Sequence, residues 1–330
     1  MGIRRRPSSR GSALLAVLWL SAALAAIAFS LANSVRGETE RTTAEVSGVR
    51  AYYLATGAVE RALLYMEWAG AFKRPDGSPG WEPGVSVLNF DFPTGQATVR
   101  IISEAARMNV NSAQPEDLYR LLLALGADSD RARGIVAGIL DWRQTVPQGV
   151  ATDFDRYYLT LNPSFRARHA SFQEIEELLL VRGMTPDLFY GTYERDDAGR
   201  LTPRGGLRDC VSIFGSTSVF DVNGAEPALL AAIGLSPEAV SAIVARRRVA
   251  PFRTMDELAA FGRGPGFDRL AIVPGQDVTV RATARLRLPN GELSGERRSV
   301  AALVHFDYRN FKPDGRRYSY RRWYDDVWAQ

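Results

Sequence analysis

An uncharged apolar run lies close to the N-terminus. Residues 12–32 read SALLAVLWLSAALAAIAFSLA, and no charged residue occurs between Arg10 and Arg36. About 20 apolar residues, at a rise of about 1.5 Å each, span a hydrocarbon core about 30 Å thick. The residues before the run include four arginines and no acidic residue. By the positive-inside rule, this pattern predicts a membrane-spanning helix over residues 12–33 with its N-terminus in the cytoplasm.

Three kinds of N-terminal segment share this pattern. A secretory signal is cleaved at a small-x-small site, but the candidates at 23–25 and 26–28 lie inside the apolar run. A plain signal anchor keeps its basic residues. A prepilin-type signal is cut on the cytoplasmic side after a glycine, and Gly11 stands between a basic leader and Ser12. The third interpretation makes residues 1–11 a cleaved leader.

Helical spacing continues beyond the apolar run. Apolar residues recur at intervals of three or four, and they include Val46, Val49, Tyr53, Val59, Leu63 and Met66. No proline occurs between Pro7 and Pro75. A single helix from 12 to 68 would be about 85 Å long. We therefore expect one helix over 12–70, with its first half in lipid and its second half packed on a globular head.

Strand patterns occur near both ends of the expected head. Residues 70–95 are rich in Gly, Pro and aromatic residues and predict a loop, whereas 96–103 is rich in β-branched residues and predicts a strand. Residues 277–288 alternate with period two. A turn signal at 289–291 separates them from a partner strand at 297–308.

A helical block separates these strands. Residues from about 108 to 267 have helical spacing, so the pattern indicates an insertion into a small antiparallel sheet. The predicted fold class is α+β. The sheet would come from 71–105 and 271–330, and the insertion over 106–270 would be an all-α domain.

Two stretches of the insertion echo one another. The segments at 108–113 and 220–225 each place a polar-Val-Asn sequence before an apolar helix, a Gly turn and an Ala-rich second helix. We expect Asn111 and Asn223 to act as N-cap or Asx-turn residues. Thr254 is expected to cap a further helix.

These paired helices resemble helix-hairpin-helix modules, which bind DNA phosphates through the backbone amides of a G-x-G hairpin. Here the hairpins read Gly-Ala-Asp at 126–128 and Gly-Leu-Ser at 234–236, so the second glycine is missing and Asp128 would repel phosphate. The arginines at 246–248 suit a DNA patch, but they also complement a helix C-terminus. We expect structural use. A membrane-anchored DNA-binding protein of the competence type remains the alternative.

Composition and motifs give no evidence for nucleic-acid binding or for catalysis. The 41 basic residues include the four of the leader, so 37 basic and 37 acidic residues would remain after cleavage. A neutral mature chain gives no argument for nucleic acid. The single cysteine, Cys210, excludes an intramolecular disulfide and is expected in the core. His169 and His305 are isolated, and no metalloprotease, redox, hydrolase or Walker motif occurs. We therefore expect that the chain is not an enzyme.

Several stretches resemble the K-type minor pseudopilins of the bacterial type II secretion system. The most specific is YYLTLNPSFRARHASFQEIEELLLVRGMTPDLFYG at 157–191, followed by LRDCVSIFGSTSVFDVNGAEPALL at 207–230 and Asp-Trp-Arg at 141–143. The resemblance covers most of the chain, from Gly11 to about 308. It implies a pilin-like α/β head with a large inserted helical domain.

The resemblance also implies a processed N-terminus. Prepilin peptidase would cut between Gly11 and Ser12, and Ser12 would become the N-methylated first residue. The fifth mature position is Ala16, where most pilins and pseudopilins carry Glu. A carboxylate in the bilayer core costs about 2.5–3.5 kcal/mol, so it needs a partner, which in assembled pilins is the terminal amine of a neighbouring subunit. A tip subunit has no neighbour above it, so Ala16 suits a capping subunit.

The partners and location follow from the same resemblance. The chain would join I-type and J-type minor pseudopilins, and other pseudopilins, at the tip of the pseudopilus. There it would help to initiate assembly and support export of folded proteins from the periplasm across the outer membrane. Before assembly it would be a single-pass protein of the inner membrane with a periplasmic head.

Some members of this family bind calcium in the head. The candidate ligands here are Asp153 and Asp155. Because Ca²⁺ takes about six to eight oxygen ligands, two local carboxylates favour a solvated loop instead. The basic aromatic stretch RRYSYRRW at 316–323 is expected to be a mobile tail or a partner contact rather than a nucleic-acid site.

Overall fold

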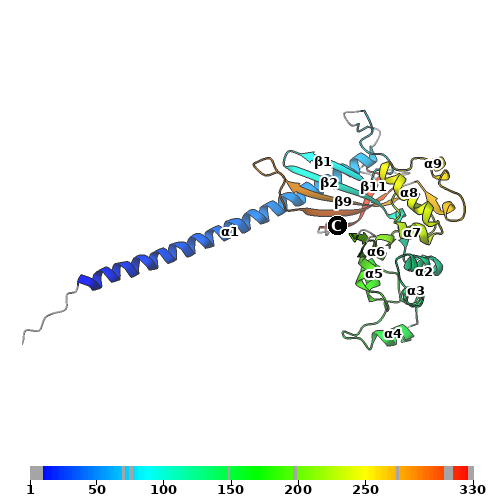
Figure 1. Cartoon of the computed structure of the whole chain (residues 1–330), viewed down its shortest axis with the longest axis horizontal. Helices are drawn as coiled ribbons and strands as arrows, with labels where there is room; N and C mark the ends of the chain where they lie inside the picture. Colours follow the sequence, from blue (N-terminus) through cyan, green and yellow to red (C-terminus); the bar gives the residue numbers. More distant parts are fainter. Residues whose placement is uncertain are drawn as a thin grey trace, which may run out of the picture.

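A long helix leads from the N-terminus into a head that combines a sheet with a mainly helical insertion (Figure 1). The computed structural model describes residues 10–68, 71–73, 77–147, 149–195, 199–272, 275–307 and 315–325. Helix α1 runs from Arg10 to Glu67 as one unbroken 58-residue helix. The prediction of a single long helix is therefore confirmed.

The described residues form one antiparallel sheet of five strands in the order β1-β2-β9-β10-β11. Its strands are β1 (Val87–Phe92), β2 (Gly95–Ser103), β9 (Asp277–Leu286), β10 (Arg298–Phe306) and β11 (Tyr318–Tyr324). The three strands predicted from alternation are confirmed to within two residues at each end. The mixed helix-and-antiparallel-sheet class is confirmed with them.

Two edge strands correct the sequence analysis. Strand β1 lies inside the predicted loop, and its apolar residues Leu88 and Phe90 are buried on the head core. Strand β11 lies inside the predicted mobile tail, where it pairs with β10 through a register shift between Leu303 and Val304. The predictions of a loop and of a mobile tail were wrong for the same reason, while a partner contact of 316–323 stays a prediction. Each strand is short and sits beside Gly or Arg, which masks its alternation.

The head core lies between the sheet and the second half of α1. Small residues of the helix, Ala55, Ala58 and Ala62, alternate with larger ones and are fully buried. They let the helix axis approach β2, β9 and β10 closely. By contrast, Val46, Val49 and Tyr53 are exposed, so these three residues do not belong to the packed face.

The insertion between β2 and β9 has an apolar core of its own, separate from that of the head. Its α-helices are α2 (Pro115–Ala124), α3 (Ser129–Arg143), α4 (Asp153–Tyr158), α5 (Pro186–Tyr190), α6 (Leu207–Cys210), α7 (Pro227–Ala232), α8 (Pro237–Val249) and α9 (Met255–Ala259). Short 3-10 helices add η1 (Glu104–Ala106), η2 (Ile175–Leu180) and η3 (Phe267–Arg269). Thr254 caps α9 as predicted, because its Oγ1 accepts from the N–H of Glu257 at 3.3 Å.

The insertion is not all-helical, which corrects that prediction. Its described residues contain three two-stranded sheets. They pair β3 (Met108–Asn109) with β6 (Val211–Ser212), β4 (Thr192–Arg195) with β5 (Leu201–Arg204), and β7 (Phe220–Asp221) with β8 (Leu270–Ala271). Strands of two to four residues are too short to give a period-two signal.

The helix pairs α2–α3 and α7–α8 are held by corresponding hydrogen bonds. Asn111 exchanges two hydrogen bonds with the backbone of Phe172, at 2.7 and 3.0 Å. Asn223 does the same with Phe252, at 2.8 and 3.0 Å. The prediction that both asparagines are N-cap or Asx-turn residues is wrong, because residue 114 precedes α2 and residue 226 precedes α7. The turns are closed by the side chains of residues 109 and 221, which accept from the N–H groups of Asn111 and Asn223. Each asparagine instead joins its helix pair to a later segment.

The last turns of the second helices also correspond. Arg143 at the end of α3 donates to the carbonyls of Val110 and Ala113, each at 2.8 Å. Arg247 in α8 donates to the carbonyls of residues 222 and 225, at 2.9 and 2.6 Å. Arg247 is therefore engaged inside the protein and is not part of a free basic surface.

We predict that Leu63→Ala lowers the free energy of unfolding of the head by about 2–5 kcal/mol, because it leaves a cavity between α1 and the sheet. Leu63 has no exposed surface, whereas 42% of its neighbour Leu64 is exposed. The matched control Leu64→Ala is expected to cost less than about 1 kcal/mol. Urea unfolding of the detergent-solubilised chain measures both values. Equal losses would contradict the packing described.

Candidate functional site

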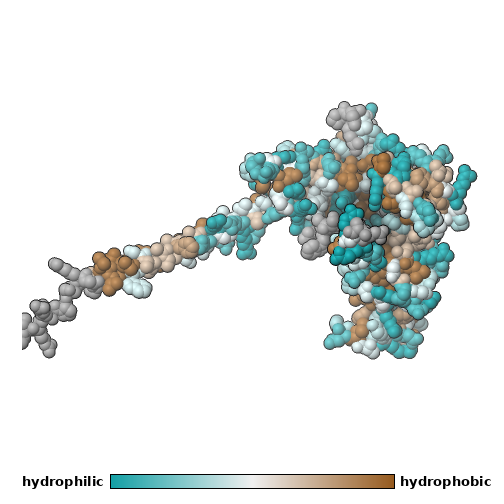
Figure 2. Space-filling model, in the orientation of Figure 1, coloured by the Kyte–Doolittle hydropathy of each residue, from teal (hydrophilic) through white to brown (hydrophobic). Residues whose placement is uncertain are grey.

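The first part of α1 offers an apolar surface that no other described residue covers. Every side chain from Ala13 to Val46 is exposed, and these include the large apolar residues Trp19 and Phe29. Figure 2 shows apolar surface along the N-terminal part of the helix and hydrophilic surface near its junction with the head. Among the described helices, α1 alone is long and apolar enough to cross a membrane.

The predicted processing residues lie at the start of this surface. Gly11 and Ser12 are in the first turn of α1, and Ala16 is an exposed position one turn later. Residues 1–9, which hold most of the predicted leader, are outside the described residues. The structure thus places the predicted cleavage position immediately before the apolar face of α1.

In both hairpins of the insertion, N–H groups at the start of the second helix donate to a side chain of the hairpin. The N–H groups of Asp130 and Arg131 donate to Asp128 Oδ1 at 3.1 and 2.9 Å. In the second hairpin, the N–H of Ala239 donates to Ser236 Oγ at 3.2 Å. The residues that replace the second glycine are therefore N-caps. They occupy three of the N–H groups that could otherwise contact a DNA phosphate.

The calcium candidates serve a different structural purpose. Asp155 is buried, and its oxygens accept from the backbone N–H groups of Thr152 and Ala167, at 3.2 and 3.0 Å. Asp153 is exposed and pairs with Arg156 at 2.8 Å. Within the described ranges, no group of three or more His, Cys, Asp or Glu residues could hold a metal ion. As placed, these two aspartates do not fit calcium, which needs more oxygen ligands.

Asp155 is paired with a histidine that sequence reasoning left isolated. His169 Nε2 lies 2.9 Å from Asp155 Oδ2, and His169 Nδ1 lies 3.1 Å from the carbonyl oxygen of Asp141. Burial opposes the charged imidazole, but these two acceptors raise the pKa of His169 overall. Burial likewise opposes the carboxylate, but His169 and the backbone N–H donors lower the pKa of Asp155 overall. The attraction between His169 and Asp155 therefore holds α4 against the segment that contains His169.

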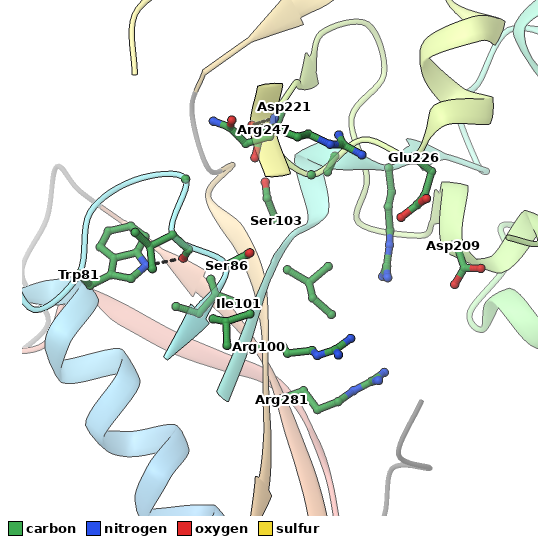
Figure 3. A pocket seen from close by; sticks show the side chains of 18 residues that line it. Trp81, Ser86, Arg100, Ile101, Ser103, Asp209, Asp221, Glu226, Arg247 and Arg281 are labelled. Atoms are coloured by element: carbon green, nitrogen blue, oxygen red, sulfur yellow. Dashed lines mark hydrogen bonds between the residues drawn. The ribbon is translucent and has the colours of Figure 1, made fainter. Parts of the chain in front are cut away.

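A polar cavity of about 360 Å³ lies where the sheet meets the insertion (Figure 3). Asp221 is buried in its wall, and its Oδ1 accepts from the N–H of Asn223 at 3.0 Å. Burial raises the pKa of Asp221 to about 6, although hydrogen bonds and the charge of Arg247 oppose the shift. Burial also raises the pKa of Glu226, again against the attraction of Arg247.

The sequence pattern did not indicate this junction. The segment around Asn223 stands out as a repeated motif, but no role was predicted for Asp221. The available signal was a charged residue inside an otherwise apolar Phe-Asp-Val stretch. A carboxylate in such a stretch is buried only where other polar groups surround it.

We predict that Asp221 makes the stability of the chain fall as pH rises from about 4 to 6. Its pKa is raised above the ordinary value of 3.8, so the folded state binds more protons than the unfolded state in this window. Asp221→Asn is expected to flatten that slope and to gain about 1–3 kcal/mol at pH 7.5 relative to pH 4. Urea unfolding across this pH range measures the slope.

The exposed Asp187 supplies a matched control for this prediction. Asp187→Asn should leave the slope unchanged. If Asp221→Asn kept the wild-type slope, the burial assigned to Asp221 would be contradicted.

Comparisons with known proteins agree on one family. A family model described as type II secretion system (T2SS), protein K matches residues 98–191, from β2 to α5. Type II secretion system protein K of Pectobacterium carotovorum subsp. carotovorum is 28% identical over 204 residues, which cover 56% of this chain and 61% of that protein. The protein of the same description from Pseudomonas aeruginosa is 27% identical over 175 residues, which cover 49% of this chain and 48% of that protein.

A solved structure extends the likeness over most of the fold. The crystal structure of the GspK-GspI-GspJ complex from the type 2 secretion system of enterotoxigenic Escherichia coli contains a chain that matches with a TM-score of 0.52. The match covers 88% of this chain and 98% of that chain, at 16% sequence identity. Identity this low shows a shared fold. The chain thus shares its fold with that chain, and its sequence is similar to type II secretion system protein K over about half of its length.

Proposed function

We propose that the chain is a minor pseudopilin that ends the type II secretion pseudopilus and helps to initiate its assembly. The observation that carries the proposal is the continuity of α1. One unbroken helix exposes its apolar first half and packs its second half under the sheet of the head. A helix exposed in this way is suited first to lipid and later to the helices of neighbouring subunits.

Prepilin peptidase would prepare this helix for assembly by cutting between Gly11 and Ser12. Cleavage would remove the arginines that fix the orientation of the segment and leave Ser12 as a new, N-methylated terminus. Before assembly the chain would remain in the inner membrane with its head in the periplasm. The apolar face of α1 begins just after the proposed cut, which supports this assignment.

Two features support a position at the tip. Ala16 removes the carboxylate that would need the terminal amine of a neighbouring subunit, because an unpaired charge in the bilayer is expensive. In addition, the insertion lies on the side of the head away from the N-terminal end of α1 (Figure 1). A head with this bulk would obstruct a further subunit stacked above it but would not obstruct subunits added from the membrane side.

The partners would be the I-type and J-type minor pseudopilins, followed by the other pseudopilins. The solved relative is described as part of a complex with GspI and GspJ. The shared fold supports the same assembly for this chain. In that assembly the exposed part of α1, including Val46, Val49 and Tyr53, is available for neighbouring helices.

The proposed role is not enzymatic. Cys210 is buried, and burial raises the pKa of its thiol, so it is held as an unreactive core residue. The DNA-binding alternative is less favoured, because Asp128 and Ser236 accept from N–H groups at the helix starts and Asp128 would repel a phosphate.

Deletion of the chain from its own bacterium is expected to stop type II export, so that folded substrates collect in the periplasm. The wild-type chain should restore export and co-purify with the I-type and J-type subunits from detergent extracts. Immunoblots of culture medium, periplasm and extract measure both outcomes. Undiminished export without the chain would contradict the proposed function.

Within the same assay, Ala16→Glu tests the tip position. The added charge has no partner at the tip, so export is expected to fall about tenfold or more. Ala16→Gln, which is similar in size and uncharged, is the control and should retain export. If Ala16→Glu retained full export, Ala16 would give no support to a position at the tip.

A further inference from the structure

Four arginines converge where the sheet meets the insertion. Arg100 of β2 and Arg281 of β9 lie directly opposite each other in the antiparallel register. Figure 3 shows their side chains beside one another, directed to the same side of the sheet. Arg107, which follows η1, and Arg208 of α6 approach from the insertion. Like charges placed directly opposite on neighbouring strands are destabilising, so this pair needs compensation.

The chain itself compensates only part of this charge. Arg107 lies 3.6 Å from Glu104, and Arg208 lies 3.7 Å from Asp209. The side chains of Arg100 and Arg281 have neither a hydrogen bond nor an ion pair within the described ranges. Glu226 also attracts Arg107. Arg107 and Arg208 thus have counter-charges nearby, whereas Arg100 and Arg281 have none in contact among the described residues.

Of the four arginines, Arg281 most lacks partners for its charge and its N–H donors. Its Nε atom is buried and has no hydrogen-bond acceptor. Burial lowers the pKa of Arg281, and the charges of Arg107, Arg100 and Arg208 lower it further, with only Asp209 opposing them. A buried polar atom without a partner in a folded protein calls for an unseen water or ion.

There is room for such a group on both sides of Arg281. The cavity of about 360 Å³ described above and a second cavity of about 310 Å³ are both lined by Arg107, Asp209 and Arg281. The second cavity lies against Arg208 and residues of β10. Carboxylates also line both cavities, among them Glu226 in the first and Glu104 in the second. None of them forms an ion pair with Arg100 or Arg281 in the described part of the chain, so water alone would leave these two charges without a counter-ion in contact.

We propose that this arginine cluster (Arg100, Arg107, Arg208 and Arg281) binds an oxyanion, supplied as the carboxylate of an acidic peptide or as free phosphate. Planar guanidinium groups present paired N–H donors that match the two oxygens of a carboxylate or phosphate. Because the donors come from both the sheet and the insertion, the bound anion joins the two parts of the head. The proposal stands on its own and does not depend on the function proposed above.

Thermal unfolding of the full chain in detergent tests the proposal, with chloride replaced at constant ionic strength by phosphate, acetate or a hexaglutamate peptide. At about twenty times the dissociation constant, mass action raises the melting temperature by about 3 °C. An effect of hexaglutamate at about tenfold lower concentration than acetate identifies an acidic peptide as the source. A phosphate effect without a peptide effect identifies free phosphate. No saturable shift with any of the three overturns the proposal.

Substitutions locate the effect. Arg281→Gln and Arg100→Gln should abolish the anion-dependent shift, whereas Arg263→Gln, at an exposed arginine outside the cluster, should keep it. Arg100→Glu places a carboxylate opposite Arg281, so it should raise the melting temperature in chloride and remove the response to anions. A full anion response in Arg281→Gln or in Arg100→Glu overturns the proposal. Because Arg100 is exposed, its variants are expected to fold even if Arg281→Gln does not.

Discussion

The contact between the second half of α1 and the sheet is the interaction on which the rest of the head depends. A small antiparallel sheet must bury one face against another element to be stable, and here that element is a helix that continues into the exposed apolar segment. Polar contacts extend the same interface, since Glu60 accepts from Tyr320 at 2.5 Å and Glu67 accepts from the N–H of Arg317 at 2.7 Å. The position of the apolar segment is therefore fixed relative to the head through one rigid helix.

The insertion is attached to this assembly in a different way. Its core is separate, and its junction with the sheet is polar, with Thr279 donating to Glu104 at 2.6 Å and Arg253 pairing with Glu82 at 2.9 Å. Arg322 of β11 also pairs with Glu174 of the insertion. Junctions that contain buried charge and cavities respond to pH and to ions more than apolar cores do. We therefore expect the contacts of the insertion to depend on pH and ionic conditions more than the packing of α1 does.

The sequence was informative where the signal is local. Period-two alternation located β2, β9 and β10, helical spacing located α1, and the Thr254 cap followed from its own neighbours. It failed where the deciding partner is distant. The position of Asn111 in the sequence predicts a helix cap, but its side chain binds the backbone of Phe172, which is 61 residues away. In the same way, the opposition of Arg100 and Arg281 depends on strand register, which the sequence does not state.

The central claim is that α1 is held in the membrane by a removable leader and is then released as one rigid element of a fiber. The most direct test is the N-terminal residue of the mature chain, determined by mass spectrometry of protein purified from its own bacterium. The account predicts a methylated Ser12, which leaves α1 intact from its first turn. A mature chain that begins at Met1, or at a residue beyond Ala28, would contradict it.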